Sequence, residues 1–442
     1  MLLALAVPAQ ALAATGASLD REATEAFTRA DYGAVLRLVP PQSSDVPPSK
    51  TLLRLAVQSA IKLGRPEEGF QLYERLVTAG QADDERLLRP LGISFLTAYV
   101  RDSRDHLRIA AYSALADLNL PEQQPIFEDG LLDPSPIVRA RAIEALGRAK
   151  LGAKSQALRR ALQDASASVR IAAMNVLSDA QVTDIMPRLI EVARTEDGPE
   201  GVFAYAALYR LGKQDMLADI TSAATLPDPE TRMAALGVLG RLKRPSTLNV
   251  LSQGVYDPEP SVRAFAAGAL GEFGEAGAIA PLTHALGDEH ARVRAVAAAS
   301  LGRVGTKESR PLLHALTRDA SMQVRAGAVE GLLRLGDQTA VLIATDLARH
   351  PDPSVRASTA QSLGAASSKE ALAILQTLLQ DQQPQPRLYA AKALGKLSLP
   401  VLALVKNALH DTDPAIRITA AGSLLSQLSS TAKSSSARGR KG

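Results

Sequence analysis

Ten arginines recur at a fixed spacing along most of this chain. They are Arg108, Arg139, Arg170, Arg232, Arg263, Arg294, Arg325, Arg356, Arg387 and Arg417. The spacing is 31 residues, except for a gap of 62 after Arg170 and a last gap of 30. The long gap equals two periods, so we expect an eleventh unit near Phe203 that lacks its arginine. A fixed period of about 20 to 50 residues is typical of a repeat array, in which each unit buries its apolar face against its neighbours.

Each arginine lies in a pattern typical of an amphipathic helix. A leucine stands seven positions after it in all ten units, alanine stands three positions after it in nine, and an apolar residue usually precedes it. These three offsets fall on one helix face, which we expect to be the buried seam. Six units place glycine directly after the leucine, as at Gly271. A glycine there predicts the end of the helix.

The segment before each arginine predicts a turn. Eight units carry aspartate six positions before the arginine: Asp102, Asp133, Asp164, Asp257, Asp288, Asp319, Asp381 and Asp411. Asp and Ser cap the free amides of a helix start, and Pro suits its first turn, as in the sequence from Asp133 to Pro136. An apolar helical segment precedes each turn, so every unit is predicted to consist of a helix, a turn and a second helix.

This unit resembles the HEAT repeat, and more narrowly the HEAT-like repeat of the phycobilisome-lyase type. The likeness rests on the turn aspartate, the Val-Arg pair, the alanine and the Leu-Gly pair, as between Asp257 and Gly271, and it covers roughly residues 90 to 428. The resemblance implies an all-α, right-handed α-solenoid of about eleven repeats, with each second helix on the concave side. It also implies a structural ladder between repeats, made by Asp133, Arg139, Asp164, Arg170, Asp257, Arg263, Asp288, Arg294, Asp319, Arg325, Arg356, Asp381, Arg387, Asp411 and Arg417.

The two ends of the chain fall outside the repeat. Residues 1–13 are apolar, end in Ala11-Leu12-Ala13 and are interpreted as a signal peptide, which predicts export to the periplasm; a frayed helix in a cytoplasmic protein is the alternative. Residues 20–100 are similar to tetratricopeptide units, with a turn at Leu63-Gly64, or form a helical cap. The array proper is assigned to residues 101–428. Residues 429–442 are Ser-rich and basic and predict a disordered tail.

The amino-acid composition excludes or disfavours several kinds of site and partner. Cysteine is absent, which excludes disulfides, thiolate metal sites and cysteine nucleophiles. The net charge of +4 is matched by four basic residues of the tail, so no basic stripe favours nucleic acid along the repeats. Basic residues nine positions after the arginine, such as Arg148 and Arg241, are attributed to helix ends. No run approaches the ~20 apolar residues that a membrane helix needs.

No motif in the sequence indicates catalysis or a cofactor. The six histidines include no His-Glu dipeptide, which the deoxyhypusine hydroxylases, built on similar repeats, use as iron ligands. His284 and His314 lie 30 residues apart on equivalent helices and could be neighbours, but two imidazoles alone make a poor metal site. We therefore expect no enzyme activity, no cofactor and no metal.

The concave face is the expected functional surface. We predict a monomeric, non-catalytic scaffold that binds another protein or peptide through positions two and five after the arginine. The candidate contact residues are Arg141, Glu144, Asn175, Phe265, Glu330, Gln361, Tyr389 and Lys392. The rival interpretation is a lyase or chaperone-like enzyme subunit similar to the phycobilin lyases, or, further off, an oxidoreductase similar to deoxyhypusine hydroxylase.

Overall fold

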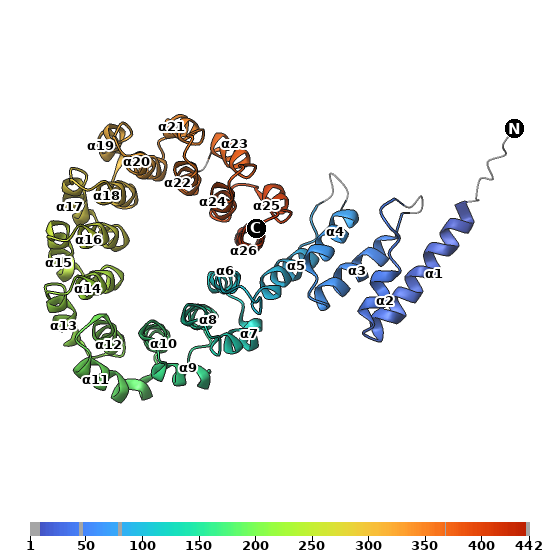
Figure 1. Ribbon diagram of the computed structural model, residues 1–442, viewed down its shortest axis with the longest axis horizontal. Helices are drawn as coiled ribbons and strands as arrows, with labels where there is room; N and C mark the ends of the chain where they lie inside the picture. Colours follow the sequence, from blue (N-terminus) through green and yellow to red (C-terminus); the bar gives the residue numbers. More distant parts are fainter. Residues whose placement is uncertain (1–8, 44–46, 78–81, 367, 439–442) are drawn as a thin grey trace.

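The computed structural model shows an all-α solenoid (Figure 1). It describes residues 9–43, 47–77, 82–366 and 368–438, with side chains between 17 and 429 in those ranges. The described residues form α-helices and short 3₁₀ turns and no strand. From α6 onward the helices lie in two layers, one on the inside and one on the outside of a curve (Figure 1).

The second helix of each unit, which carries the repeating arginine, lies in the inner layer. The inner helices are α6 (Asp105–Ala116), α8 (Pro136–Arg148), α10 (Ala167–Asp179), α12 (Pro199–Arg210), α14 (Pro229–Leu242), α16 (Pro260–Phe273), α18 (Ala291–Val304), α20 (Met322–Arg334), α22 (Pro353–Leu363), α24 (Pro384–Leu394) and α26 (Pro414–Arg438).

The first helix of each unit forms the outer layer, often after a 3₁₀ turn. The outer helices are α7 (Gln124–Gly130), α9 (Gln156–Arg160), α11 (Met186–Thr195), α13 (Met216–Ala223), α15 (Leu248–Gln253), α17 (Ile279–Ala285), α19 (Arg310–Leu316), α21 (Ala340–Leu347), α23 (Lys369–Leu378) and α25 (Leu402–Ala408). The 3₁₀ turns are η1 (Pro121–Gln123), η2 (Ala161–Gln163), η3 (Thr183–Ile185), η4 (Pro245–Thr247), η5 (Gly254–Tyr256), η6 (Ala276–Ala278) and η7 (Lys307–Ser309).

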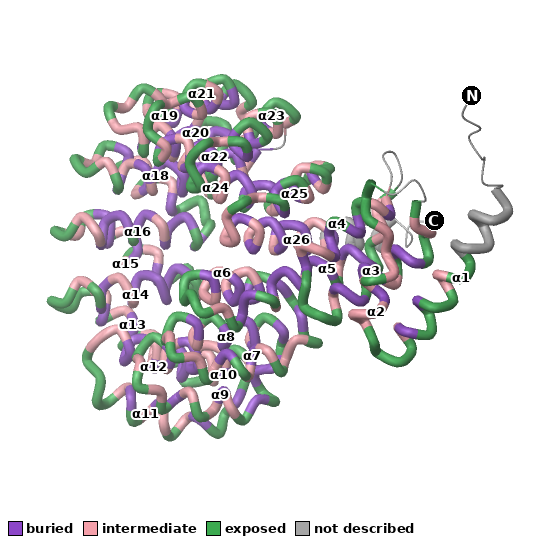
Figure 2. Tube along the Cα trace, turned by 45° about the vertical axis from the view of Figure 1, so that its right-hand side comes forward, coloured by how far each residue is buried: buried purple, intermediate pink, exposed green. Residues whose placement is uncertain are grey.

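The core runs between the two layers along the whole array. In α16 the seam positions Val262, Ala266 and Leu270 are fully buried, and Leu251 and Leu282 meet them from the outer layer. Figure 2 shows the same alternation, with buried stretches where helices face their neighbours and exposed stretches at the turns. The seam predicted from the spacing of the apolar residues is therefore confirmed.

Two of the six glycines after the leucines, Gly364 and Gly395, directly follow the last residues of α22 and α24 as predicted, whereas the other four lie inside helices. Gly271 and Gly302 lie inside helices, and none of the six has a positive φ. A Cβ on Gly302 would lie 2.3 Å from the Cα of Gly331, so these glycines let adjacent inner helices approach each other. Left-handed residues that end helices come later, at Gly274 after α16 (φ +79°) and at Gly336 after α20 (φ +74°). The spacing alone could not distinguish close packing from helix termination.

The unit expected near Phe203 is present as α11 and α12. Gly201 stands where the arginine would be, and a Cβ there would lie 2.0 Å from the carbonyl oxygen of Glu196. The backbone thus approaches too closely at this position for any side chain, which explains why this unit has no arginine. The unit still packs between α10 and α14 in the inner layer (Figure 1).

Five helices precede the array. They are α1 (Ala9–Thr28), α2 (Tyr32–Arg37), α3 (Lys50–Lys62), α4 (Pro66–Leu76) and α5 (Glu85–Ala98). The turn between α3 and α4 contains Gly64 in a left-handed conformation, at φ +66°. Tyr73 of α4 is fully buried, and its hydroxyl donates to Asp83 and accepts from the amide of Asp84. Residues 1–8 of the predicted signal peptide lie outside the described residues.

The array closes into a ring, which the sequence did not indicate. The last inner helix, α26, packs against α5 and α6 at the other end of the array (Figures 1 and 2). A Cβ on Gly422 of α26 would lie 3.2 Å from the Cβ of Ala114, and one on Gly92 of α5 would lie 3.1 Å from Leu425. The two ends of the array therefore pack directly on each other.

Polar contacts also flank this closing interface. Lys406 pairs with Asp83 at 2.7 Å, and His410 lies 3.0 Å from Glu74. Arg417 donates to the hydroxyl of Tyr99 at 2.7 Å, and Arg89 donates to Ser429 at 3.4 Å. These groups lie more than 300 residues apart in sequence, so no local pattern could have paired them.

The last helix extends beyond residue 428, where a disordered tail was predicted. Helix α26 continues to Arg438, and residues 439–442 lie outside the described residues. Ser423 donates to the carbonyl of Ala391, and Ser426 donates to the carbonyl of Gly395. These two serines, which precede the predicted tail, join α26 to α24.

Candidate functional site

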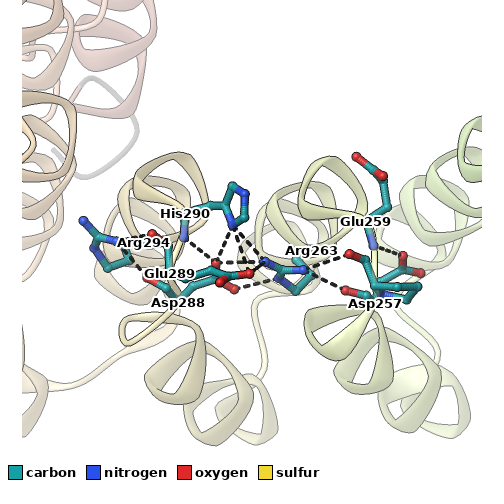
Figure 3. Close-up of polar contacts among 8 residues, drawn as sticks. Asp257, Glu259, Arg263, Asp288, Glu289, His290 and Arg294 are labelled. Atoms are coloured by element: carbon teal, nitrogen blue, oxygen red, sulfur yellow. Dashed lines mark hydrogen bonds and ion pairs between the residues drawn. The ribbon is translucent and has the colours of Figure 1, made fainter.

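The repeating arginines join consecutive turns, as Arg263 illustrates (Figure 3). Its Nη1 donates to the carbonyls of Asp257 at 3.0 Å and Pro258 at 3.2 Å in its own unit. Its Nε and Nη2 donate to the two carboxylate oxygens of Asp288 in the next unit, at 2.7 and 3.1 Å. Asp288 in turn accepts from the amide of His290 at 2.8 Å. One planar guanidinium therefore fixes the relative position of two repeats.

The same two-pronged geometry recurs along the array. The pairs are Arg108 with Asp133, Arg139 with Asp164, Arg232 with Asp257, Arg263 with Asp288, Arg294 with Asp319, Arg356 with Asp381, and Arg387 with Asp411. Both partners are largely buried; the side chains of Arg294 and Asp319 are 18% and 10% exposed. We refer to these pairs as rungs. Burial and complete hydrogen bonding make them structural parts of the array.

The rungs shift the protonation equilibria of their carboxyl groups. Hydrogen bonds from Arg139, Arg294 and Arg356 hold the pKa values of their aspartate partners below the ordinary value, against the opposing effect of burial. The same bonds raise the pKa of Arg294. Each pair is thus stabilised in its charged form.

Three arginines depart from the regular rung. Arg170 binds Glu200, which replaces the missing turn aspartate of the α12 unit, with Nε 2.6 Å from Oε1. Arg417 at the end of the array lies 3.4 Å from Glu67 and donates to Tyr99, so it reaches the N-terminal helices instead of another repeat. Arg325 forms no ion pair with a described residue. Sequence reasoning had placed all three in the ladder without specifying these partners.

The eight candidate contact residues lie on six helices of the inner layer and form no single cluster. Arg141, Gln361 and Lys392 are exposed on α8, α22 and α24, whereas Tyr389 is half-buried. Several of the polar candidates are already bound within the protein. Arg141 pairs with Glu144 at 2.6 Å, Glu330 accepts from Arg334, and Asn175 accepts from Arg210 at 2.9 Å.

Phe265 is the largest exposed apolar side chain among these candidates. It is 43% exposed on α16. A Cβ on Gly237 of α14 would lie 2.9 Å from its ring, so the ring rests in the space that this glycine leaves. Position two of one unit therefore leans onto position five of the unit before it. Phe265 both fills a gap and presents part of its ring to solvent on the inner layer.

Basic residues at the ends of the inner helices reach back to the preceding repeat. Arg148 donates to the carbonyl of Ala116 at 3.4 Å, and the guanidinium of Arg241 lies 5.8 Å from the ring centre of Phe203. Arg210 donates to Asn175, and burial lowers the pKa of its guanidinium. Packing and hydrogen bonds to carbonyls therefore explain why basic residues recur nine positions after the arginine.

The histidines are engaged separately. His284 packs on Tyr256, with ring centres 4.4 Å apart, whereas His314 lies 2.8 Å from Asp337. Within the described part of the chain, no three His, Asp or Glu residues are arranged to hold a metal ion.

No helix within the described ranges is sufficiently long and apolar to cross a bilayer.

Comparison with solved structures returns other helical repeat proteins. One is the complex of CpcE and CpcF of phycocyanin lyase from Nostoc sp. PCC7120, at 17% identity, covering 61% of this chain and 94% of that one, with a TM-score of 0.36. A mutant of Kap121p aligns with 95% of this chain but 51% of its own, at 13% identity and a TM-score of 0.38. Human deoxyhypusine hydroxylase aligns at 20% identity, covering 64% and 98%, with a TM-score of 0.28.

All three TM-scores lie below 0.5. The chain spans about half the length of the Kap121p structure. No curated protein matches the sequence.

A sequence profile, unlike the solved structures, identifies the family of this chain. The profile of HEAT repeats matches residues 78–147, 129–202, 249–321 and 309–387, which together make up more than half of the chain. The unmatched stretch between them contains α13 and α14, next to the unit without its arginine. With the two-layer helices and the arginine rungs, this match shows that the chain belongs to the HEAT-repeat family.

Proposed function

We propose that this protein is a non-catalytic scaffold that binds another polypeptide on the inner layer of its ring. The observation that carries the proposal is Phe265, a ring 43% exposed on an inner helix. Aromatic side chains supply large contact areas and are enriched among the residues that dominate binding energy. An exposed aromatic ring beside glycines and alanines is a suitable anchor for a partner side chain.

The rest of the inner layer supports a polypeptide over a small polar ligand. Arg141 and Glu144 are already paired, and Gln361 and Lys392 are exposed singly on separate helices. A small ligand needs several polar groups that converge on one point. An extended or helical polypeptide can instead contact dispersed groups one after another.

The double change Phe265→Ala and Tyr389→Ala tests this assignment. A partner first has to be identified by capture from the native organism and then titrated directly by calorimetry. We expect the double variant to lose about 2 kcal/mol or more of binding free energy, because both anchors would be removed. Melting should fall only modestly, because both rings are partly exposed.

Tyr256→Ala provides the matched control. This tyrosine is 57% exposed but lies in η5, in the outer layer. Unchanged affinity of this control, together with a weakened double variant, would support the inner layer as the binding surface. Undiminished affinity of the double variant would refute it. A shifted visible absorption band on mixing with a bilin would instead favour an enzyme subunit similar to the phycobilin lyases.

We also propose that the protein is exported and that the mature chain begins near Ala14. The support is the apolar segment that ends in Ala11-Leu12-Ala13. Among the described side chains, Leu19 is partly buried and Ala23 is the first that is fully buried, so cleavage near Ala14 would spare this packing. Mass spectrometry of the native protein should find Ala14 at or near the N-terminus. An intact Met1 would refute export by this route.

A further inference from the structure

One rung of the array lacks its carboxylate. In eight units aspartate stands six positions before the arginine, but the unit of Arg356 has His350 there. His350 Nδ1 accepts from the amide of Asp352 at 3.1 Å. The aspartates of the other turns accept from the equivalent amide, as Asp319 does from Ser321 at 2.8 Å. His350 therefore preserves the turn and omits the negative charge.

Arg325 is the arginine left without that partner. In regular rungs Nε points to the carboxylate of the next unit, as Arg294 Nε does to Asp319 at 2.9 Å. In Arg325 the Nε instead donates to the carbonyl of Asp319 in its own unit, at 2.6 Å. Its Nη groups form no hydrogen bond or ion pair with a described residue. In the regular rungs, Nε and Nη2 both donate to a carboxylate. The Nη groups of Arg325 therefore remain free to bind another acceptor.

A cavity of about 580 Å³ opens at this place, between α19 and α21. Its polar lining comes from Arg325, Arg318, His314, Thr317 and Asp346. Pro311, Ile343 and Leu347 form its apolar wall.

The charges of this cavity favour an anion. Arg318 is exposed, and neither arginine pairs with Asp346, the one carboxylate in the lining. His314 already bonds Asp337 through Nε2. Two guanidiniums therefore face one exposed carboxylate, in a cavity that also has apolar surface.

We propose that this cavity binds a carboxylate with a short apolar body, which completes the missing rung by accepting from Arg325. The regular rungs define the chemistry, because each supplies a carboxylate to the guanidinium fork. Arginine and carboxylate form two parallel hydrogen bonds that other anions match less well in shape. Pro311, Ile343 and Leu347 would contact the apolar body. The carboxylate could belong to a free acid or to the C-terminus of a polypeptide.

Calorimetric titration of the full chain with paired probes tests the proposal. N-acetyl-leucine represents a polypeptide C-terminus, 4-methylpentanoate represents a free acid, and the amide of each lacks the charge. We expect at least one acid to bind about ten-fold more tightly than its amide. Binding of both acids indicates that the carboxylate and its apolar body suffice. Binding of N-acetyl-leucine alone indicates a polypeptide terminus. Equal binding of acids and amides, or no binding of either acid, would overturn the proposal.

Two substitutions of His350 test whether the acid binds beside Arg325. His350→Asp should supply the missing carboxylate internally, raise the melting temperature of the free protein and weaken acid binding about ten-fold or more. His350→Asn retains an acceptor for the amide of Asp352 without the charge, so it should bind the acid as the parent does. If His350→Asp melts higher yet binds the acid unchanged, the acid lies elsewhere and the proposal is wrong.

A third variant keeps the test independent of position 350. Arg325→Gln should abolish the preference for acid over amide, whereas Arg292→Gln, an exposed change on α18, should leave it intact. A preserved preference in Arg325→Gln would contradict the assignment. Neither change touches Phe265 or Tyr389, so failure here is distinguishable from failure of the inner layer as a binding surface.

Discussion

At the scale of single residues, the arginine that marks the period is a connector between repeats. Its guanidinium satisfies two carbonyls of its own turn and one carboxylate of the next, which explains why one residue type recurs at this position. The turn aspartate also has two tasks, because it accepts from the amide two residues further on in its own turn and receives the preceding arginine. Removing either partner leaves the other largely buried and without its hydrogen bonds. The free-energy cost of this loss exceeds the net contribution of the intact pair.

Arg294→Ala measures this cost. We expect it to lower the free energy of unfolding by about 1 to 3 kcal/mol, because Asp319 keeps its charge but loses both hydrogen bonds from the guanidinium. Urea unfolding gives the value. Arg292→Ala on the same helix is the control and should change it by less than about 0.5 kcal/mol, since Arg292 is exposed. Equal effects of the two changes would show that the rung adds nothing beyond a surface arginine.

At the scale of helices, close approach matters more than side-chain volume. Gly302 faces Gly331, and Gly237 receives the ring of Phe265, so small residues set the distance between inner helices. The same device operates where the ends of the array meet, at Gly92 and Gly422. Helix α26 thereby acts as the neighbour of α6, although more than 300 residues separate them.

Gly422→Leu should open the ring. A side chain there would press on Ala114 of α6, whose Cβ lies only 3.2 Å from the position of the new Cβ. We expect the radius of gyration from small-angle X-ray scattering to rise while the helix content by circular dichroism is retained. Gly268→Leu, five positions after its arginine like Gly422, is the control, because the nearest atom lies at an ordinary 3.7 Å. An unchanged radius for Gly422→Leu would mean that closure tolerates the intrusion.

At the scale of the whole molecule, stability is distributed over many similar contacts. Each repeat packs mainly on its neighbours, and the rungs repeat the same charge pair along the ring. Conditions that weaken one rung therefore weaken several at once.

Acid should unfold the array through these rungs. The pKa values of Asp164, Asp319 and Asp381 are lowered in the folded protein, so between those values and about 3.9 the unfolded chain binds more protons. Stability from these groups is then complete above about pH 4 and is lost as the pH falls through the folded values. Urea unfolding from pH 6 downward measures it. Arg294→Ala should show a smaller loss, and an identical loss would remove the Arg294 rung from the explanation.

The sequence by itself determined the repeating unit. The 31-residue arginine spacing, the leucine seven positions later and the turn aspartates predicted helix, turn, helix, because these signals depend on neighbours within one unit. They also predicted the buried seam, and the absence of arginine near Phe203 predicted an irregular unit. Four of the six glycines after the leucines lie inside helices and not at their ends, because a glycine required by a neighbouring helix looks the same in sequence as one that ends its own.

Only the tertiary structure decided how the repeats close and which groups remain free. Small rotations between repeats add up along the array, and their sum brings α26 onto α5 and α6. The partners of Arg417 and Lys406 follow from that closure and have no signal in the spacing. His350 was visible as a missing aspartate, but the redirected Nε of Arg325 and the cavity beside it depend on packing between repeats. A periodic sequence specifies each contact between neighbours, whereas the shape of the ring is the accumulated result of all of them.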